Sequence, residues 1–225
     1  MNATRLTEHL IQLTRLRLVN AYLVREDDGF TLVDTTVARG GLALIAAARA
    51  AGAPIRRIAL THGHGDHVGS VDQLARELGP EVEVLMPELD ARIHAGEHVV
   101  EGKVSGSWPK LTTVPAVRLK PEDHVGSLLA IPSPGHTPGH MAFLDTRDRT
   151  LIAGDVFTSF GELAVSNHFY WRFPFAAMAT FDATQDLRSA QALQSLDPAL
   201  LVVGHGPAIH SPGAAMDAAI TRAGG

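Results

Sequence analysis

The chain has 225 residues, of which 45% are hydrophobic and 19% charged, with 19 lysines and arginines, 24 aspartates and glutamates, and no cysteine. This length fits one globular domain that can bury a core of its own. The lack of cysteine excludes a disulfide scaffold, a thiolate zinc finger and a cysteine nucleophile. The net charge of −5 argues against a protein that mainly binds nucleic acid or anionic lipid.

The apolar segments are too short for targeting or membrane insertion. The first twenty residues interrupt every apolar run with a polar or charged side chain, and the run at 42–48 is far below the roughly 20 residues needed to span a bilayer. We therefore expect a soluble cytoplasmic protein that acts on a small molecule, without a nucleic-acid or membrane partner. Assembly into a homo-oligomer is left open.

The first half of the chain is predicted to start with strands and to continue with alternating helices and strands. Asp27-Asp28 before Gly29 is typical of a hairpin turn. An alanine-rich helix opens at Gly40 and is stopped by Gly52. The predicted elements are strands at 13–18, 21–25 and 30–34, a helix at 41–51, a strand at 57–61, a helix at 70–78, a strand at 83–86 and a helix at 88–95.

The second half repeats this organisation after a loop at 96–113. Its predicted elements are strands at 116–119, 127–131, 141–145 and 150–153, a helix at 181–196, a strand at 200–203 and a helix at 212–222. Two similar halves favour two sheets packed face to face with helices outside. The prediction is therefore a single α/β (α+β) domain over 1–225, with wall or lid loops at about 96–113 and 157–176.

Twelve histidines equal in number all the aromatic residues together, and several are spaced like metal ligands. The sequence THGHGDH at 61–67 follows a predicted strand. Because alternate residues of an extended chain face the same way, His62 and His64 can converge on one ion. Asp66 and His67, at the start of the next helix, then point towards a neighbouring position. Nitrogen and oxygen donors of this kind suit Zn²⁺, Mn²⁺ or Fe²⁺.

Three later donors occupy the same kind of position in the chain. His136 lies in the sequence SPGHTPGH after an apolar strand, Asp155 in AGD directly after another, and His205 in GHG after a third. Each donor thus stands beside glycine at the end of a strand, where loops gather over a rigid sheet edge. Seven donors in this shared context indicate a metal site.

This pattern resembles the metallo-β-lactamase superfamily of four-layer αββα sandwich hydrolases, over nearly the whole chain. The resemblance implies a binuclear site with two ligand sets joined by one carboxylate. The first metal would be held by His62, His64 and His136, the second by Asp66, His67 and His205, and Asp155 would bridge them together with a water or hydroxide. Asp34 matches a recurrent carboxylate of the family, and it would either orient a ligand or cap a turn.

The resemblance implies a hydrolase that attacks with a metal-bridging hydroxide, because two bound cations lower the pKa of water from 15.7 to about 7 and polarise the scissile group. Zinc is the expected metal, with manganese or iron as alternatives. Asp66 would hold the proton of the hydroxide and pass it to the leaving group.

We expect the substrate to be a small ester, lactone or thioester with an apolar part. The alternatives are phosphodiester or phosphonate hydrolysis, and oxidation by an iron-dependent enzyme of the sulfur dioxygenase type. S-acylglutathione is disfavoured as the substrate, because the 20 residues after His205 contain one cation, Arg222.

Eight of the 12 aromatic residues lie between 157 and 181, directly after Asp155. This stretch is expected to form either an apolar wall over the pocket or a buttress packed under the sandwich. His140 is expected either to support a metal ligand or to be a structural residue of its loop, and His94 and His98 are expected to be exposed at a helix end. The candidate pocket residues are Trp108, Phe157, His168, Tyr170 and Trp171.

Overall fold

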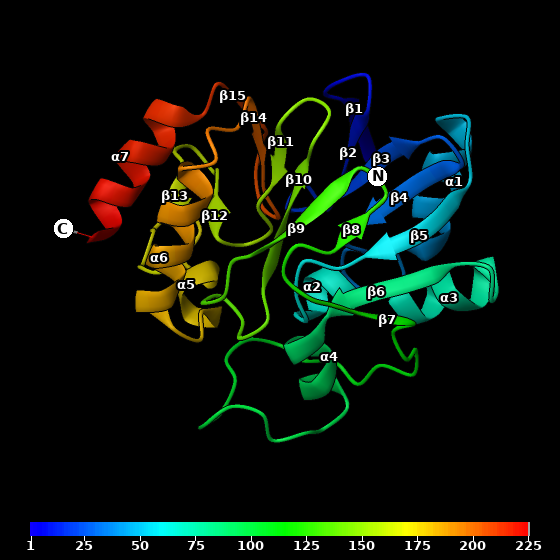
Figure 1. Cartoon of the computed structure of the whole chain (residues 1–225), viewed down its shortest axis with the longest axis horizontal. Coiled ribbons are helices and arrows are strands. Elements are labelled where there is room, and N and C mark those ends of the chain that lie inside the picture. Colours follow the sequence, from blue (N-terminus) through cyan, green and yellow to red (C-terminus); the bar gives the residue numbers. More distant parts are fainter. Residues whose placement is uncertain (225) are drawn as a thin grey trace.

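The computed structural model describes residues 1–224 and contains two β-sheets enclosed by two groups of helices (Figure 1). The first sheet has the strand order β1-β2-β3-β4-β5-β6-β7 and the second β15-β14-β11-β10-β9-β8. Helices α1 and α3 cover the outer face of the first sheet, and α6 and α7 lie outside the second. The predicted four-layer αββα architecture is confirmed.

The first half supplies the seven-stranded sheet and four helices. Its elements are β1 (Asn2–Arg5), β2 (Leu10–Arg15), β3 (Val19–Glu26), β4 (Gly29–Val33), α1 (Gly41–Ala50), β5 (Ile55–Ala59), α2 (Gly65–Val68), α3 (Val71–Leu78), β6 (Glu83–Pro87), α4 (Glu88–His94) and β7 (Val117–Leu119). Glu26 pairs with Gly29 across β3 and β4, which confirms the hairpin predicted at Asp27-Asp28.

The second half supplies the six-stranded sheet, a two-stranded ribbon and three helices. Its elements are β8 (His124–Val125), β9 (Leu128–Pro132), β10 (Met141–Asp145), β11 (Thr150–Ile152), β12 (Phe157–Thr158), β13 (Ala164–Val165), α5 (Phe175–Ala179), α6 (Ala183–Gln194), β14 (Leu200–Val202), β15 (Ile209–His210) and α7 (Gly213–Gly224). Strands β12 and β13 form the ribbon, which contacts α6 and α7.

Alternating side chains of the strands divide the core between the layers. On β3, Tyr22 and Val24 pack between the two sheets, whereas Ala21 and Leu23 pack towards the helices of the first half. On β14, Val202 faces the central layer and its neighbour Leu201 faces the layer beneath α6 and α7. This period of two is what a sheet buried on both faces requires. Within residues 1–224, no helix is both long and apolar enough to span a bilayer.

Several boundaries differ from the prediction by a few residues, and for two of them the reason can be identified. The strand predicted at 13–18 ends at Arg15, because Leu16 and Arg17 adopt left-handed φ values of 55° and 59° and turn the chain into β3. Neither residue is a usual turn former, so the sequence conceals the turn. The helix predicted at 181–196 begins at Ala183, because the Asp182 side chain accepts a hydrogen bond from the Gln185 N–H and caps it.

Candidate metal centre

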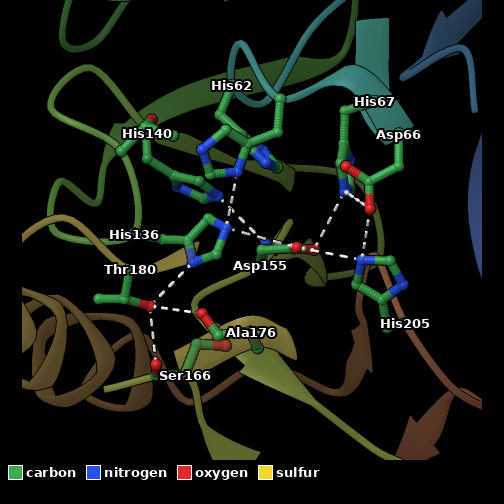
Figure 2. A network of polar contacts seen from close by, with 12 residues as sticks. His62, Asp66, His67, His136, His140, Asp155, Ser166, Ala176, Thr180 and His205 are labelled. Carbon is green, nitrogen blue, oxygen red and sulfur yellow. Dashed lines mark hydrogen bonds and ion pairs between the residues drawn. The ribbon is translucent and has the colours of Figure 1, made fainter. Parts of the chain in front are cut away.

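The seven predicted donors meet at one edge of the sandwich, although they come from four separate loops. Figure 2 labels six of these donors, all except His64. These loops follow β5, β9, β11 and β14. Strands β11 and β14 are parallel, and β9 is antiparallel to β10, which is antiparallel to β11. The C-terminal ends of β9, β11 and β14 therefore lie at the same edge. Backbone bonds from Met141 N–H to Thr61 O and from Asn20 N–H to Gly204 O join this edge to the first sheet.

The donor atoms form two groups, in each of which they lie within 4.8 Å of one another. The groups are His62, His64 and His136, and Asp66, His67, Asp155 and His205. Asp155 lies between them: its Oδ2 is 3.5 Å from His136 Nε2 and 3.1 Å from His205 Nε2. Its Oδ1 is 3.3 Å from His67 Nε2. One carboxylate thus faces both groups.

Three buried atoms in this cluster have no hydrogen-bond partner: His62 Nε2, His67 Nε2 and Asp155 Oδ1. An unpaired polar atom away from water costs about 1–3 kcal/mol, so such atoms need an explanation. They are lone-pair donors that point into the cluster, as metal ligands do. The donor set fits a pair of divalent cations that prefer nitrogen and oxygen. The two groups therefore have the composition and arrangement of a candidate binuclear metal site.

Asp34 holds two of the histidines from outside the cluster. Its Oδ2 accepts a hydrogen bond of 2.8 Å from His67 Nδ1–H and another of 2.8 Å from the Thr61 hydroxyl. Because that hydroxyl donates to Asp34, it accepts from His62 Nδ1–H, 2.9 Å away. Both Nε2 atoms are then left with a lone pair facing the centre. Of its two expected roles, Asp34 thus has the contacts of a residue that orients ligands.

The other three histidines are held in the same way. His64 Nε2–H donates to Ser105 O at 3.1 Å, and His205 Nδ1–H donates to Leu18 O at 3.0 Å. His136 Nδ1–H donates to Thr180 Oγ1 at 3.1 Å. Each outward nitrogen is therefore a donor, so each inward nitrogen can present its lone pair to a cation.

The substitution Asp34→Asn is expected to weaken metal binding by about 10–100-fold, the usual effect of losing an outer-shell partner. The amide can accept at only one of the two oxygen positions: with its oxygen at Oδ2, its NH2 group would face the Thr61 N–H, and with its NH2 group at Oδ2, it could not accept from the Thr61 hydroxyl and His67. Competition with a chromogenic chelator measures the affinity. Asp28→Asn, an exposed carboxylate paired with Arg57, serves as the control. Wild-type affinity in a folded Asp34→Asn protein would refute this role.

The electrostatics of the two groups differ. Burial lowers the pKa of His62 and His136 well below the usual value, which favours the neutral form that binds metals. Burial also opposes charge on His67 and His205. For these two residues, the attraction of the nearby carboxylates, with Asp155 the largest contributor, outweighs the effect of burial. The pKa of His67 is therefore raised well above its ordinary value, and that of His205 is raised to about 9. The second group thus favours a positive charge, whether from a proton or from a cation.

Asp90 joins two of the four donor-carrying loops, those after β5 and β9, and was not singled out from the sequence. It lies on α4, is fully buried, and accepts hydrogen bonds from Gly63 N–H at 2.8 Å, Thr137 Oγ1–H at 2.7 Å and Gly139 N–H at 2.7 Å. Burial raises the pKa of this carboxyl to about 6, so it remains largely ionised at neutral pH. An aspartate in the first turn of a helix is ordinary, so the sequence has no signal for this role.

The substitution Asp90→Ala is expected to lower the free energy of unfolding by about 3–5 kcal/mol, because three buried donors lose their acceptor. Urea unfolding of the metal-free protein measures this effect without a contribution from bound cations. As a control, Asp182→Ala removes an exposed helix cap with one hydrogen bond and should cost about 1 kcal/mol. Equal losses in the two variants would contradict the bridging role of Asp90.

His140 supports Asp155 through the backbone. Its Nε2 accepts a hydrogen bond from Asp155 N–H at 3.1 Å, and its Nδ1–H donates to Ser133 Oγ at 2.9 Å. Gly154 makes this contact sterically feasible, because a Cβ there would lie 2.5 Å from His140 Nε2. His140 has the structural contacts expected for this loop.

A cavity of about 780 Å³ opens above the cluster. His64, Asp66, His136, Asp155 and His205 contribute to its lining. One wall is apolar and comes from the segment before and along α5; the other comes from the loop between α4 and β7. These walls consist of Phe173, Phe175, Ala176, Met178 and Ala179, and of Gly106, Ser107, Pro109, Lys110 and Leu111.

Within residues 1–224, the lining of this cavity includes none of the five predicted pocket residues. Phe157 is buried in the core beneath the second sheet. Tyr170 donates its hydroxyl hydrogen to Phe160 O, and His168 contacts Asn167. Trp171 is 70% exposed beside the Arg172 guanidinium. Nearness to Asp155 in the sequence did not identify the pocket residues, because the chain first forms the ribbon β12–β13 after Asp155 and reaches the cavity wall only at Phe173.

Trp108 and His94 also differ from expectation. Trp108 packs edge-on against His64, with 5.4 Å between ring centroids, and Gly63 admits it, because a Cβ there would lie 2.3 Å from the indole. His94 is half-buried, not exposed, and its Nε2–H donates to Gly63 O at 2.8 Å. Both side chains pack against the loop after β5, at Gly63 and His64.

The family model of the metallo-β-lactamase superfamily matches residues 14–205. Together with the fold and the seven-residue cluster, this match places the chain in that superfamily. The chain is accordingly a hydrolase of this class, as predicted.

Individual relatives agree with this assignment. The chain is 43% identical to the uncharacterized protein YobT of Bacillus subtilis strain 168, covering 91% of this chain and 90% of the relative. It is 32% identical to a hydroxyacylglutathione hydrolase of Rhodopseudomonas palustris, covering 52% of this chain and 40% of that protein. Among solved structures, TTHA1623 in a di-iron-bound form matches with a TM-score of 0.67 and 27% identity, covering 90% of this chain and 94% of that one.

Proposed function

We propose that the protein hydrolyses a small ester, lactone or thioester with an apolar part, using two divalent cations, most simply zinc. The observation that carries this proposal is the convergence of seven donors at a cavity with an apolar wall. His62, His64 and His136 would hold one cation, and Asp66, His67 and His205 the other. Asp155, which faces both groups, would bridge them.

When bound, the two cations would bring the pKa of water to about 7 and polarise the acyl carbonyl. The protein's own groups supply positioning and proton transfer. Asp66 is the most exposed of the seven side chains and lines the cavity, with its Oδ2 3.2 Å from His205 Nε2. This position supports a role for Asp66 in holding the proton of the attacking water and releasing it to the leaving group.

The cavity favours an acyl substrate over a phosphodiester. Among the described residues, Lys110 is the one lysine or arginine in its lining, whereas phosphate recognition usually employs several cationic or backbone donors. The apolar wall suits the hydrocarbon part of an acyl group. The hydroxyacylglutathione hydrolase among the relatives adds support for acyl cleavage.

The choice of zinc rests on the donor chemistry. Imidazole and carboxylate donors without thiolate bind zinc well but also accept iron or manganese, and the similar structure TTHA1623 was solved with two irons. Elemental analysis of protein purified without added metal is expected to find two equivalents of zinc. Iron combined with thiol-dependent oxygen uptake would instead establish the sulfur dioxygenase alternative.

A substrate panel tests the reaction. Aryl esters, acyl-homoserine lactones, S-lactoylglutathione, a chromogenic β-lactam and a phosphodiester would be assayed with the metal-loaded protein. Turnover of at least one ester, lactone or thioester is expected, and it should disappear in a folded His64→Ala variant. Turnover of the phosphodiester alone would refute acyl hydrolysis.

A further inference from the structure

We propose that Phe173 and helix α5 form an acyl-binding wall, in which Phe175 and Met178 determine a preference for longer unbranched acyl groups over acetyl. The inference rests on the proposed function and narrows its substrate class. It assigns a part of the substrate to a part of the cavity: the carbonyl at the metal cluster and the hydrocarbon chain along α5.

The wall exposes apolar surface beside the reactive centre. Phe175 is 64% exposed and Met178 is 73% exposed, yet both belong to the cavity lining. Large apolar side chains grouped at a cavity mark a surface that a ligand covers. Ala176 and Ala179 are the small members of the same wall, and they leave room for a narrow chain. The flexible thioether of methionine can adapt to chains of different length.

A continuous path of aromatic rings leads from the cluster to this wall. The Phe173 ring lies 4.6 Å from the His205 ring, with an interplanar angle of 35°. Phe175 follows, with its ring centroid 5.8 Å from that of Phe173. An acyl chain whose carbonyl lies at the cluster can therefore keep apolar contact outwards along the cavity.

The wall is anchored directly to the loop that carries His136 (Figure 2). Thr180 ends α5, accepts the hydrogen bond from His136 Nδ1–H, and places its hydroxyl 2.7 Å from Ser166 O and 2.9 Å from Ala176 O. Phe181 N–H adds a bond to His136 O at 3.1 Å. A five-residue helix is not stable alone, so these contacts define its position. A wall fixed in advance loses less entropy when the substrate binds.

The experiment compares kcat/KM for aryl esters of acetate, butyrate, hexanoate and octanoate. For wild type, kcat/KM should rise by about fourfold for each methylene that reaches the wall, which corresponds to ~0.8 kcal/mol per buried methylene. Phe175→Ala and Met178→Ala should each lower the octanoyl-to-acetyl ratio at least tenfold, whereas Met178→Leu should retain it. The matched control is Trp171→Ala, which removes a similarly exposed aromatic outside the lining and should leave the ratio unchanged.

Binding of the product carboxylates separates this inference from the proposed function. Calorimetry on the zinc-loaded protein should find octanoate bound more tightly than acetate, with the difference lost in Phe175→Ala and kept in Trp171→Ala. Hydrolysis of esters without any dependence on chain length would overturn the acyl wall and leave acyl hydrolysis standing. Chain-length-dependent carboxylate binding without turnover of any acyl substrate would support the wall and overturn the proposed reaction.

Discussion

Asp66→Asn is expected to lower kcat by about 10²–10⁴-fold, because the variant loses a group that can hold and return a proton. The carboxylate is placed for this role at the cavity, with Oδ2 3.2 Å from His205 Nε2 and 4.0 Å from His67 Nε2. Asparagine keeps the shape and the amide oxygen but cannot take up the proton. Steady-state kinetics at saturating metal, together with circular dichroism, measure the effect on the folded protein.

The control is the same substitution at Asp217, an exposed carboxylate on α7. Asp217→Asn should leave kcat within about twofold, since surface changes far from a site have little effect. Measuring metal content alongside kcat separates loss of the proton carrier from loss of a cation. A fully metallated Asp66→Asn enzyme with wild-type kcat would show that Asp66 carries no proton in the reaction.

Removal of the metal is expected to lower Tm by about 8–16 °C for each cation that is lost. A cation that binds the native state alone, at a free concentration of about 1,000 times Kd, stabilises it by about 4.1 kcal/mol. In a chain of this size each kcal/mol shifts Tm by about 2–4 °C. The three unpaired atoms, His62 Nε2, His67 Nε2 and Asp155 Oδ1, are the groups that would lose their partner. Differential scanning calorimetry with chelator and with added zinc measures the shift.

The variant His64→Ala provides the matched control for that shift. It removes one donor of the first group and leaves the donors of the second group intact, so the increase in Tm on adding zinc should be smaller than in wild type. A wild-type Tm that is the same with chelator and with zinc would show that the cluster binds no stabilising cation.

The donors were predictable because local sequence determines their context. His62, His64, Asp66 and His67 follow one another after β5, and His136, Asp155 and His205 each follow a strand beside a glycine. Strands that run in the same direction, either as parallel neighbours or on both sides of one antiparallel strand, have their C-terminal ends at the same edge of the sheet. The sequence therefore contains both the donor types and the reason why they meet.

The supporting residues were not predictable in this way. Asp90 and Thr180 act through contacts with segments far away in the chain, and neither lies in a motif. Helix α5 has five residues, too few for a helical period to be recognised. As a result, the aromatic segment suggested a wall, but the wall is built by Phe173 and Phe175 and not by Phe157, Tyr170 or Trp171.

Two cations bound by these seven side chains are central to the proposed reaction. Crystals of the zinc-loaded protein, measured on both sides of the zinc absorption edge, test this. We predict two anomalous peaks, one on each side of Asp155. The first should lie among His62, His64 and His136, and the second among Asp66, His67 and His205. Zinc peaks elsewhere, or an ordered cluster without a peak, would contradict it.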